Sequence, residues 1–414
     1  MGAPVKAAGA RVALVEHLEE LARLADTAGA DIVGEVTQLM DRPNPKTLLG
    51  KGKLEELRLR IDETQATLVI FDDELSPAQG RNIEQTINTR VMDRAELILD
   101  IFATRARTSE AKMQVELAQL EYTLPRLTRM WTHLEKTRGG IGMRGPGETQ
   151  LETDRRLIGH RIKLLKERLT DVVRAREVQR QSRQAEFKAS LVGYTNAGKS
   201  SILRSLADAK DIFVEDLLFA TLDPLTREVD LGERHRVLVT DTVGFIRKLP
   251  HDLVASFRAT LAEVRDSDLL LHVIDAASPM WRDHLAVVDD VLREIGVVGK
   301  EVLHVFNQID RLDDEAALDL QVRVRDEMPT AVFVSAVTAH GLEPLKRALL
   351  GVVRKRKPVV ELRVAVSDGR TLAELHRLGE VLEQRSEDGV MVVRARLDEA
   401  TAKRLQASGI AVSG

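Results

Sequence analysis

The run GYTNAGKS, residues 193–200, limits this 414-residue chain to a small group of folds. It matches GxxxxGK[ST] and lies between an apolar run predicted as a strand, KASLV, and a helical pattern, SSILRSLAD. In that context glycines let backbone N–H groups point at phosphate oxygens, and the helix N-terminus adds partial positive charge. Lys199 can neutralise the β and γ phosphates and Ser200 can bind magnesium. The motif predicts a nucleoside triphosphate site in an α/β domain.

Three further short motifs follow this loop in chain order. DTVG at 241–244, NQID at 307–310 and the pair Ser335–Ala336 each end an apolar run predicted as a strand, where α/β sheets bind ligands. The acidic residue of DTVG can hold the magnesium shell, and its glycine N–H can contact the γ-phosphate. The carboxylate of Asp310 can accept hydrogen bonds from guanine N1 and the exocyclic amine, which adenine does not offer in that form. A backbone N–H of the last pair can donate to guanine O6. Together the motifs predict that the bound nucleotide is GTP.

The segment FATLDP, residues 219–224, supplies a threonine that can close on magnesium and the γ-phosphate. The residues expected to act in catalysis are Lys199, Thr221, Gly244 and Asn196, and those expected to bind Mg²⁺ are Ser200 and Thr221. The residues predicted to contact GTP or GDP are Gly193, Tyr194, Thr195, Asn196, Ala197, Gly198, Lys199, Ser200, Phe219, Ala220, Thr221, Leu222, Asp223, Asp241, Thr242, Val243, Gly244, Asn307, Gln308, Ile309, Asp310, Ser335, Ala336 and Val337.

The chain is long enough for several domains. We predict a multidomain α/β protein, in which a doubly wound GTPase sheet follows a small α/β domain with a long helical hairpin and precedes a small α/β C-terminal domain. The predicted ranges are an N-terminal α/β domain at 1–108, an antiparallel helical hairpin at 109–186, a GTP-binding domain at 187–357 and a C-terminal domain at 358–414.

Within the N-terminal range, apolar runs alternate with helical patterns, which is typical of a mainly parallel sheet. ADIVGEVTQL at 30–39 and ATLVIFDD at 66–73 are predicted strands, while RVALVEH at 11–17 fits either a strand or the start of a helix. KLEELRLRIDET at 53–64 and SPAQGRNIEQTIN at 76–88 are predicted helices, the second opened by a capping serine and a proline.

The hairpin is predicted from apolar residues spaced four and three apart, which form the seam of two packed helices. They run from Met113 to Leu134 and from Leu151 to Val172, with one position missing at Arg155. Pro125 should kink the first helix, expected at about 110–137. A glycine-rich tip loop at 138–149 joins the helices and carries Arg138 and Arg144. It is either a floppy turn or a loop that approaches RNA closely.

Charge is unevenly distributed along the chain. The net charge is −4, but residues 101–190 hold 19 Lys and Arg against 11 Asp and Glu, which leaves −12 for the remainder. A basic segment on an acidic chain fits either a solvated helix face or binding to a phosphate backbone. The chain has no cysteine, so disulfides and thiolate zinc sites are excluded. We expect a cytoplasmic protein without a membrane segment.

Over nearly its whole length the chain resembles the HflX family of ribosome-associated GTPases, in the Obg–HflX group. The stretches that carry the resemblance are NPKTLLGKGK, DIFATRARTSEAKMQVELAQL, GGIGMRGPGETQLETDRR, GYTNAGKSS, FATLDP, DTVGFIRKLPHDLV and LLLHVIDA. The resemblance implies GTP hydrolysis stimulated by the large ribosomal subunit and its rRNA, splitting of stalled or idle ribosomes, and rescue after heat stress. It implies neither DNA nor a membrane as partner, and we expect a monomer that is partly ribosome-associated. The resemblance also implies ATP binding near Lys51 and Lys53. The alternative is that this segment is a simple glycine turn.

Two positions depart from common GTPase patterns. Gln308 replaces the family's lysine in the guanine motif, which predicts weaker guanine affinity. Phe245 occupies the position at which Ras-type enzymes orient water with glutamine, so intrinsic hydrolysis should be slow. Asn196 matches the asparagine that related GTPases use to hold K⁺, or it only hydrogen-bonds within the loop. Two alternative functions stay open: a nucleotide-gated ribosome-assembly or RNA-binding factor, and an ATP-dependent RNA-remodelling enzyme that uses the N-terminal domain.

Overall fold

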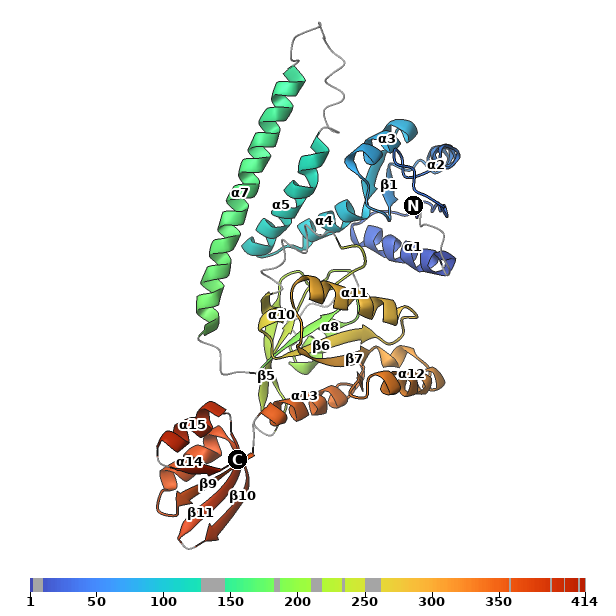
Figure 1. Ribbon diagram of the computed structural model, residues 1–414. Helices are drawn as coiled ribbons and strands as arrows, with labels where there is room; N and C mark the ends of the chain where they lie inside the picture. The colour runs from blue at the N-terminus through green and yellow to red at the C-terminus, as the bar shows by residue number, and fades with distance from the viewer. Residues whose placement is uncertain are drawn as a thin grey trace.

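The computed structural model describes most of the chain, and its elements form three successive bodies along one elongated molecule (Figure 1). The described residues are 1–2, 10–127, 146–181, 187–209, 218–232, 235–249, 262–356, 359–387, 389–397, 399–408 and 410–413. Among them no helix combines the length and the apolar character needed to cross a membrane.

The N-terminal body consists of helices around a two-stranded parallel sheet. Its elements are α1 (Ala10–Thr27), α2 (Lys51–Thr64), β1 (Leu68–Phe71), α3 (Pro77–Ile87), β2 (Arg90–Asp93) and α4 (Arg94–Arg105). α3 begins as predicted, because Ser76 and Gln79 form a reciprocal capping box and Pro77 occupies the first turn. RVALVEH is helical, whereas the strand predicted for ADIVGEVTQL is wrong. That segment is irregular, apart from an isolated bridge between Thr37 and Gly2.

Two antiparallel helices form the hairpin beside this body (Figure 1). They are α5 (Ser109–Thr123) and α7 (Pro146–Gln181), and their shared core contains six of the predicted seam residues, Met113, Leu117, Leu120, Ile162, Leu165 and Leu169. The first helix is interrupted where the kink was predicted, because Pro125 lacks an N–H and a 3₁₀ turn at Leu124–Arg126 follows α5. Residues 128–137 of the predicted helix lie outside the described residues. α7 begins inside the predicted tip loop, with Pro146 at its first position. Arg138 and Arg144 lie outside the described residues.

The central body is a doubly wound sheet of six strands in the order β4-β5-β3-β6-β7-β8, parallel except for β4. The strands are β3 (Lys188–Gly193), β4 (Leu225–Asp230), β5 (Arg236–Asp241), β6 (Leu269–Asp275), β7 (Glu301–Asn307) and β8 (Val332–Phe333). The helices are α8 (Lys199–Leu206), α10 (Ala262–Asp266), α11 (Trp281–Glu294), α12 (Asp314–Glu327) and α13 (Glu343–Arg356), with a 3₁₀ turn at Ile309–Arg311. β3 lies between β5 and β6, and the strand order reverses at this point of the sheet. A crevice therefore opens at the carboxyl end of β3.

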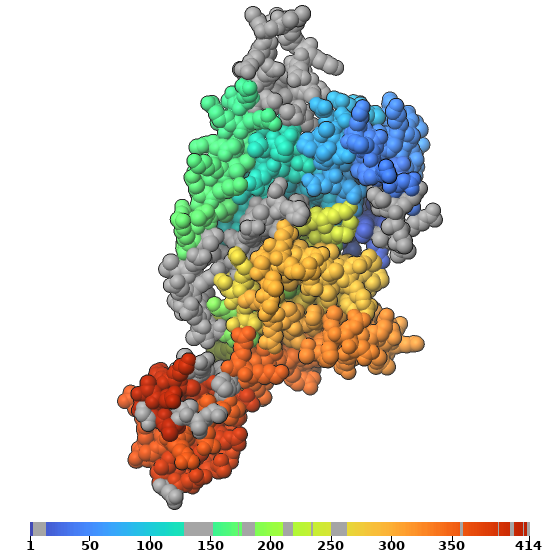
Figure 2. Space-filling view, viewed as in Figure 1, coloured from blue at the N-terminus to red at the C-terminus, as the bar shows by residue number. Residues whose placement is uncertain are grey.

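The C-terminal body lies at the opposite end of the molecule from the N-terminal body, next to the central body (Figure 2). Its elements are β9 (Val359–Ala365), α14 (Gly369–Leu378), β10 (Glu380–Glu387), β11 (Val390–Arg396), α15 (Glu399–Ala407) and β12 (Ala411–Ser413). They form an antiparallel sheet in the order β10-β11-β9-β12. The predicted α/β fold class, with a hairpin before and a small domain after the doubly wound sheet, is therefore confirmed.

Candidate functional site

The loop between β3 and α8 is built around two glycines whose conformation or surroundings exclude a side chain. Gly193 has φ +156°, and a Cβ there would lie 2.3 Å from the Val273 carbonyl oxygen. Gly198 has φ +89°, and a Cβ there would lie 2.2 Å from Asn307 Nδ2. The loop can therefore bring its backbone close to neighbouring strands and present N–H groups to an anion.

Lys199 curls back over this loop as the first residue of α8. Its Nζ donates hydrogen bonds to the carbonyl oxygens of Gly193 at 3.1 Å and Tyr194 at 2.9 Å. Burial lowers the pKa of Lys199 to about 8, while the negative charge of Asp241 acts in the opposite direction. An anion bound beside Nζ would favour the protonated amine, so the loop suits phosphate.

Three oxygen-bearing side chains converge next to Lys199. Ser200 Oγ donates to Asp241 Oδ2 at 2.6 Å and lies 2.8 Å from Thr221 Oγ1. Burial raises the pKa of Asp241, and its buried Oδ1 makes no hydrogen bond to any described residue. Two hydroxyls and a carboxylate are ligands of the type that Mg²⁺ prefers, so this donor set fits that ion.

The DTVG segment runs directly against the phosphate loop. Thr195 N donates to Phe245 O at 2.7 Å and Phe245 N donates to Gly193 O at 3.1 Å. A Cβ at Gly244 would lie 2.8 Å from Thr195 Cα and 3.1 Å from Lys199 Nζ, so there is no room for a side chain at this position. The Phe245 side chain is buried in the apolar core and takes no part in the polar site.

Asn307 joins the predicted guanine end of the crevice to the phosphate loop. Its Nδ2 donates to Ala197 O at 3.0 Å, and its Oδ1 accepts from Ala336 N at 3.2 Å. Ser335 N donates to Gly341 O at 3.2 Å, so both N–H groups of the pair predicted to offer one to guanine O6 have acceptors within the protein. Gln308 Nε2 donates to Asn196 O at 3.0 Å, so the glutamine braces the phosphate loop without a charge. Asp310 is exposed beside them.

The segment at 219–224 is divided between the crevice and the hairpin. Thr221 faces Ser200, and Phe219 N donates to Thr195 Oγ1 at 3.2 Å. The Asp223 carboxylate instead accepts from Arg107 N at 3.2 Å, and from the Thr108 N–H and hydroxyl. The predicted contact residues that line neither cavity at this site are Gly193, Leu222, Asp223, Asp241, Val243, Ile309 and Ser335.

The larger cavity, of about 1400 Å³, extends beyond the predicted residues to α1 and α11. Side chains that the motifs did not indicate include Arg23 and Glu20 on α1 and His284 on α11, which stacks on the Tyr194 ring at a centroid distance of 3.8 Å. No short motif marks these residues, because folding alone brings α1 to the crevice. The smaller cavity, about 50 Å³, lies between Lys199, Ser200 and Thr221.

Family models account for three consecutive parts of the chain. One described as GTP-binding GTPase N-terminal matches residues 15–103, and one described as GTP-binding GTPase Middle Region matches 105–183. A third, described as 50S ribosome-binding GTPase, matches 188–308. GTPase HflX of Escherichia coli strain K12 is 45% identical over 398 residues, covering 94% of this chain and 92% of that protein. GTPase HflX of Magnetococcus marinus is 46% identical over 392 residues, covering 94% and 90%.

This chain belongs to the HflX family of GTPases. The assignment confirms the resemblance seen in the sequence and the prediction of a GTP-hydrolysing enzyme. Among solved structures, a GTP-binding protein from the archaeon Sulfolobus solfataricus in complex with GDP is 27% identical, with a TM-score of 0.44. The match covers 86% of this HflX-family chain and 98% of that chain.

Proposed function

We propose that this HflX-family GTPase binds GTP with Mg²⁺ in the crevice at the carboxyl end of β3. In this proposal GTP hydrolysis switches its binding to the large ribosomal subunit, and the protein splits or rescues stalled or idle ribosomes. The observation that carries the nucleotide site is the convergence of Ser200, Thr221 and Asp241 beside the buried Lys199. A P-loop amine and a hydroxyl–carboxylate cluster suit a triphosphate and its metal ion.

Each part of the crevice has its own role in binding. Backbone N–H groups of residues 193–198 and the Lys199 ammonium hold the phosphates, and Ser200 and Thr221 are the side-chain ligands for Mg²⁺, with Asp241 behind them. The bound ion would neutralise charge that develops on the β and γ phosphates. Asp310 accepts from guanine, while Asn307 keeps the base-binding loops and the phosphate loop in register.

Hydrolysis in this proposal depends on groups other than the side chain after DTVG. The buried Phe245 has no hydrogen-bonding group to orient an attacking water. The Gly244 N–H and the Lys199 ammonium stabilise negative charge at the γ-phosphate as the transition state forms. Asn196, at the exposed tip of the loop, is the residue that would hold K⁺ as an additional positive charge.

The ribosome is proposed as partner on two grounds. The first is the description of the family model for residues 188–308, a 50S ribosome-binding GTPase. The second is the surface of α7, which extends along the hairpin and exposes Arg155, Arg156, Lys163, Lys166, Arg168 and Arg174. Cationic side chains on a projecting helix bind phosphate backbones, with an affinity that falls steeply with salt. Ribosome binding that is indifferent to salt would exclude α7 as the contact.

The test is GTP turnover by the full chain with and without purified large subunits, with ATP as competitor. Lys199→Ala should abolish turnover, whereas the matched control Lys346→Ala removes a lysine that pairs with Glu343 on α13 and should leave it unchanged. Turnover that large subunits do not stimulate would refute the ribosomal switch. Sedimentation of intact ribosomes with GTP then separates splitting from nucleotide-gated assembly, and ATP turnover that survives Lys199→Ala would favour a separate remodelling site.

A further inference from the structure

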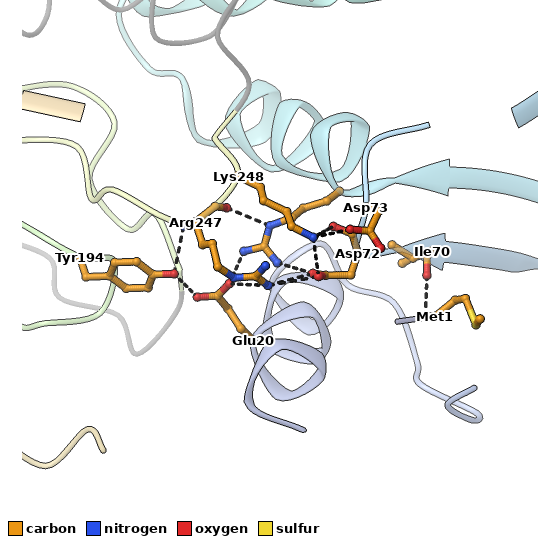
Figure 3. A network of polar contacts seen from close by, with 9 residues as sticks. Met1, Glu20, Ile70, Asp72, Asp73, Tyr194, Arg247 and Lys248 are labelled. Carbon is orange, nitrogen blue, oxygen red and sulfur yellow. Dashed lines mark hydrogen bonds and ion pairs between the residues drawn. The ribbon is translucent and has the colours of Figure 1, made fainter. Parts of the chain in front are cut away.

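A buried charge network joins the N-terminal body to the central body close to the nucleotide site (Figure 3). At its centre is Arg94, the first residue of α4, whose side chain is 1% exposed. Its Nη1 donates to Asp72 Oδ1 at 2.8 Å, and its Nη2 donates to Glu20 on α1. Both carboxylates are buried, so the guanidinium and its two partners depend on one another for solvation.

The central body contributes two cations to this network, three and four residues after Gly244. Arg247 Nη2 lies 3.1 Å from Asp72 Oδ2, and Lys248 Nζ lies 3.1 Å from the same oxygen. Arg94 Nε also donates to Arg247 O at 3.1 Å, so the backbone of this segment is held as well as its side chains. The segment at 244–248, which leaves the γ-phosphate position, is thus bound to the N-terminal body.

Tyr194, the second residue of the phosphate loop, also connects the nucleotide site to this network. Its hydroxyl donates to the Glu20 carboxylate and accepts from Arg247 N at 3.0 Å (Figure 3). Burial and the neighbouring Glu20 raise the pKa of Tyr194, so the hydroxyl keeps its proton and remains a donor. Glu20 on α1 therefore contacts the phosphate loop directly. It contacts the segment after DTVG through this hydroxyl and through an ion pair with Arg247 Nη2 at 3.9 Å.

The carboxylates of this network face two of their cations, Arg247 and Lys248, only while the two bodies are docked. Three carboxylates, Glu20, Asp72 and Asp73, face three cations, Arg94, Arg247 and Lys248. Burial alone would raise the pKa of Asp72, but the charges of Arg94, Lys248 and Arg247 outweigh it and hold that pKa well below its ordinary value. Removing one partner from a buried ion network leaves an uncompensated charge, so partial opening of the contact between the two bodies is unfavourable.

The segment at 219–224 is attached to the same side of the molecule. Phe219 packs edge-on against Phe102 of α4, with 4.6 Å between ring centroids. Asp223 accepts from backbone N–H groups at the N-terminus of α5, where a carboxylate is favourable. Both segments that surround the γ-phosphate position therefore contact α4 or the start of the hairpin, which α4 precedes directly.

We propose that Glu20, Asp72 and Arg94 are positioning residues for the segment at 244–248, and that docking of α1 and α4 is coupled to the γ-phosphate. This inference rests on the proposed GTP site. The network holds Gly244 against Thr195 and Lys199, which is the position in which its N–H can contact the third phosphate. By linkage, a γ-phosphate that stabilises this position must strengthen docking by the same factor.

Substitutions at the edge of the network test the coupling between docking and the γ-phosphate, because they leave Arg94, Asp72 and Glu20 in place. Lys248→Gln removes a half-exposed cation, and Tyr194→Phe removes one hydroxyl. Each should weaken binding of a non-hydrolysable GTP analogue about five- to tenfold and change GDP affinity less than about twofold. Lys248→Arg should restore the wild-type ratio because it keeps the charge. Arg236→Gln, which breaks an exposed pair with Glu228 on the same sheet, is the matched control and should change neither affinity.

Hydrogen exchange of α4 amides in the full chain supplies the second readout. In the wild type the GTP analogue should slow exchange in Arg94–Arg105 relative to GDP, and in Lys248→Gln this difference should disappear. Equal loss of affinity for both nucleotides, or unchanged ratios in both variants, would overturn the coupling while leaving the proposed function intact. A wild-type protein that bound neither nucleotide would refute the proposed function itself.

Discussion

Replacing Asn307 by aspartate keeps the shape of the side chain but exchanges a hydrogen-bond donor for an acceptor. The amide that donates to Ala197 O at 3.0 Å becomes an oxygen that faces a carbonyl oxygen. Because Asn307 is 1% exposed, water cannot take over the lost bond. The bond from Ala336 N to Oδ1 is kept. A lost hydrogen bond together with a buried, unsatisfied carbonyl should lower the free energy of unfolding by about 2–4 kcal/mol.

Urea unfolding of Asn307→Asp and of a matched control measures this cost. Asn82 Nδ2 donates to Lys46 O at 2.9 Å in the same way but at an exposed position, so Asn82→Asp should cost no more than about 0.5 kcal/mol. If about 3 kcal/mol of this free energy is lost from the phosphate-loop conformation that binds GTP, GTP affinity measured by calorimetry should drop about a hundredfold. The defect should narrow at low pH, because a protonated carboxyl can donate to Ala197 O. Equal costs in the two variants would refute the assigned role of Asn307.

Three further predictions concern the same crevice. Gln308→Lys should bind GDP about fivefold more tightly, because a charged donor replaces a neutral one at Asn196 O; calorimetry showing equal or weaker binding would contradict this. The lowered pKa of Lys199, about 8, means that GTP affinity should be flat below pH 8 and then fall by up to about tenfold per pH unit. An affinity that does not change with pH would refute the assignment. Because the unfolded chain binds this proton more tightly than the ligand-free fold, the contribution of Lys199 to the stability of that fold should increase as pH rises from 8 towards 10.5. If Asn196 holds K⁺, GTP turnover should be about tenfold faster in potassium than in sodium salts, and identical rates would exclude that role.

The sequence predicted those features that depend on local backbone geometry. GYTNAGKS requires glycines at fixed positions between a strand and a helix, and both flanking elements formed as expected. The capping serine and proline at the start of α3 are equally local signals. The strand predicted for ADIVGEVTQL was wrong, because apolar residues mark a strand only where a partner strand is available, and among the described residues this segment forms one isolated bridge, between Thr37 and Gly2.

Contacts between distant segments were decided by the tertiary structure. Nothing near Asp223 in the sequence indicates that its carboxylate meets the start of α5, and nothing near Arg94 indicates Arg247 as a partner 153 residues away. The sequence determined by itself where a triphosphate can bind, because phosphate loops are built from consecutive residues. Only the tertiary structure decided what surrounds that loop, because burial of charged and aromatic side chains depends on which surfaces fold against one another.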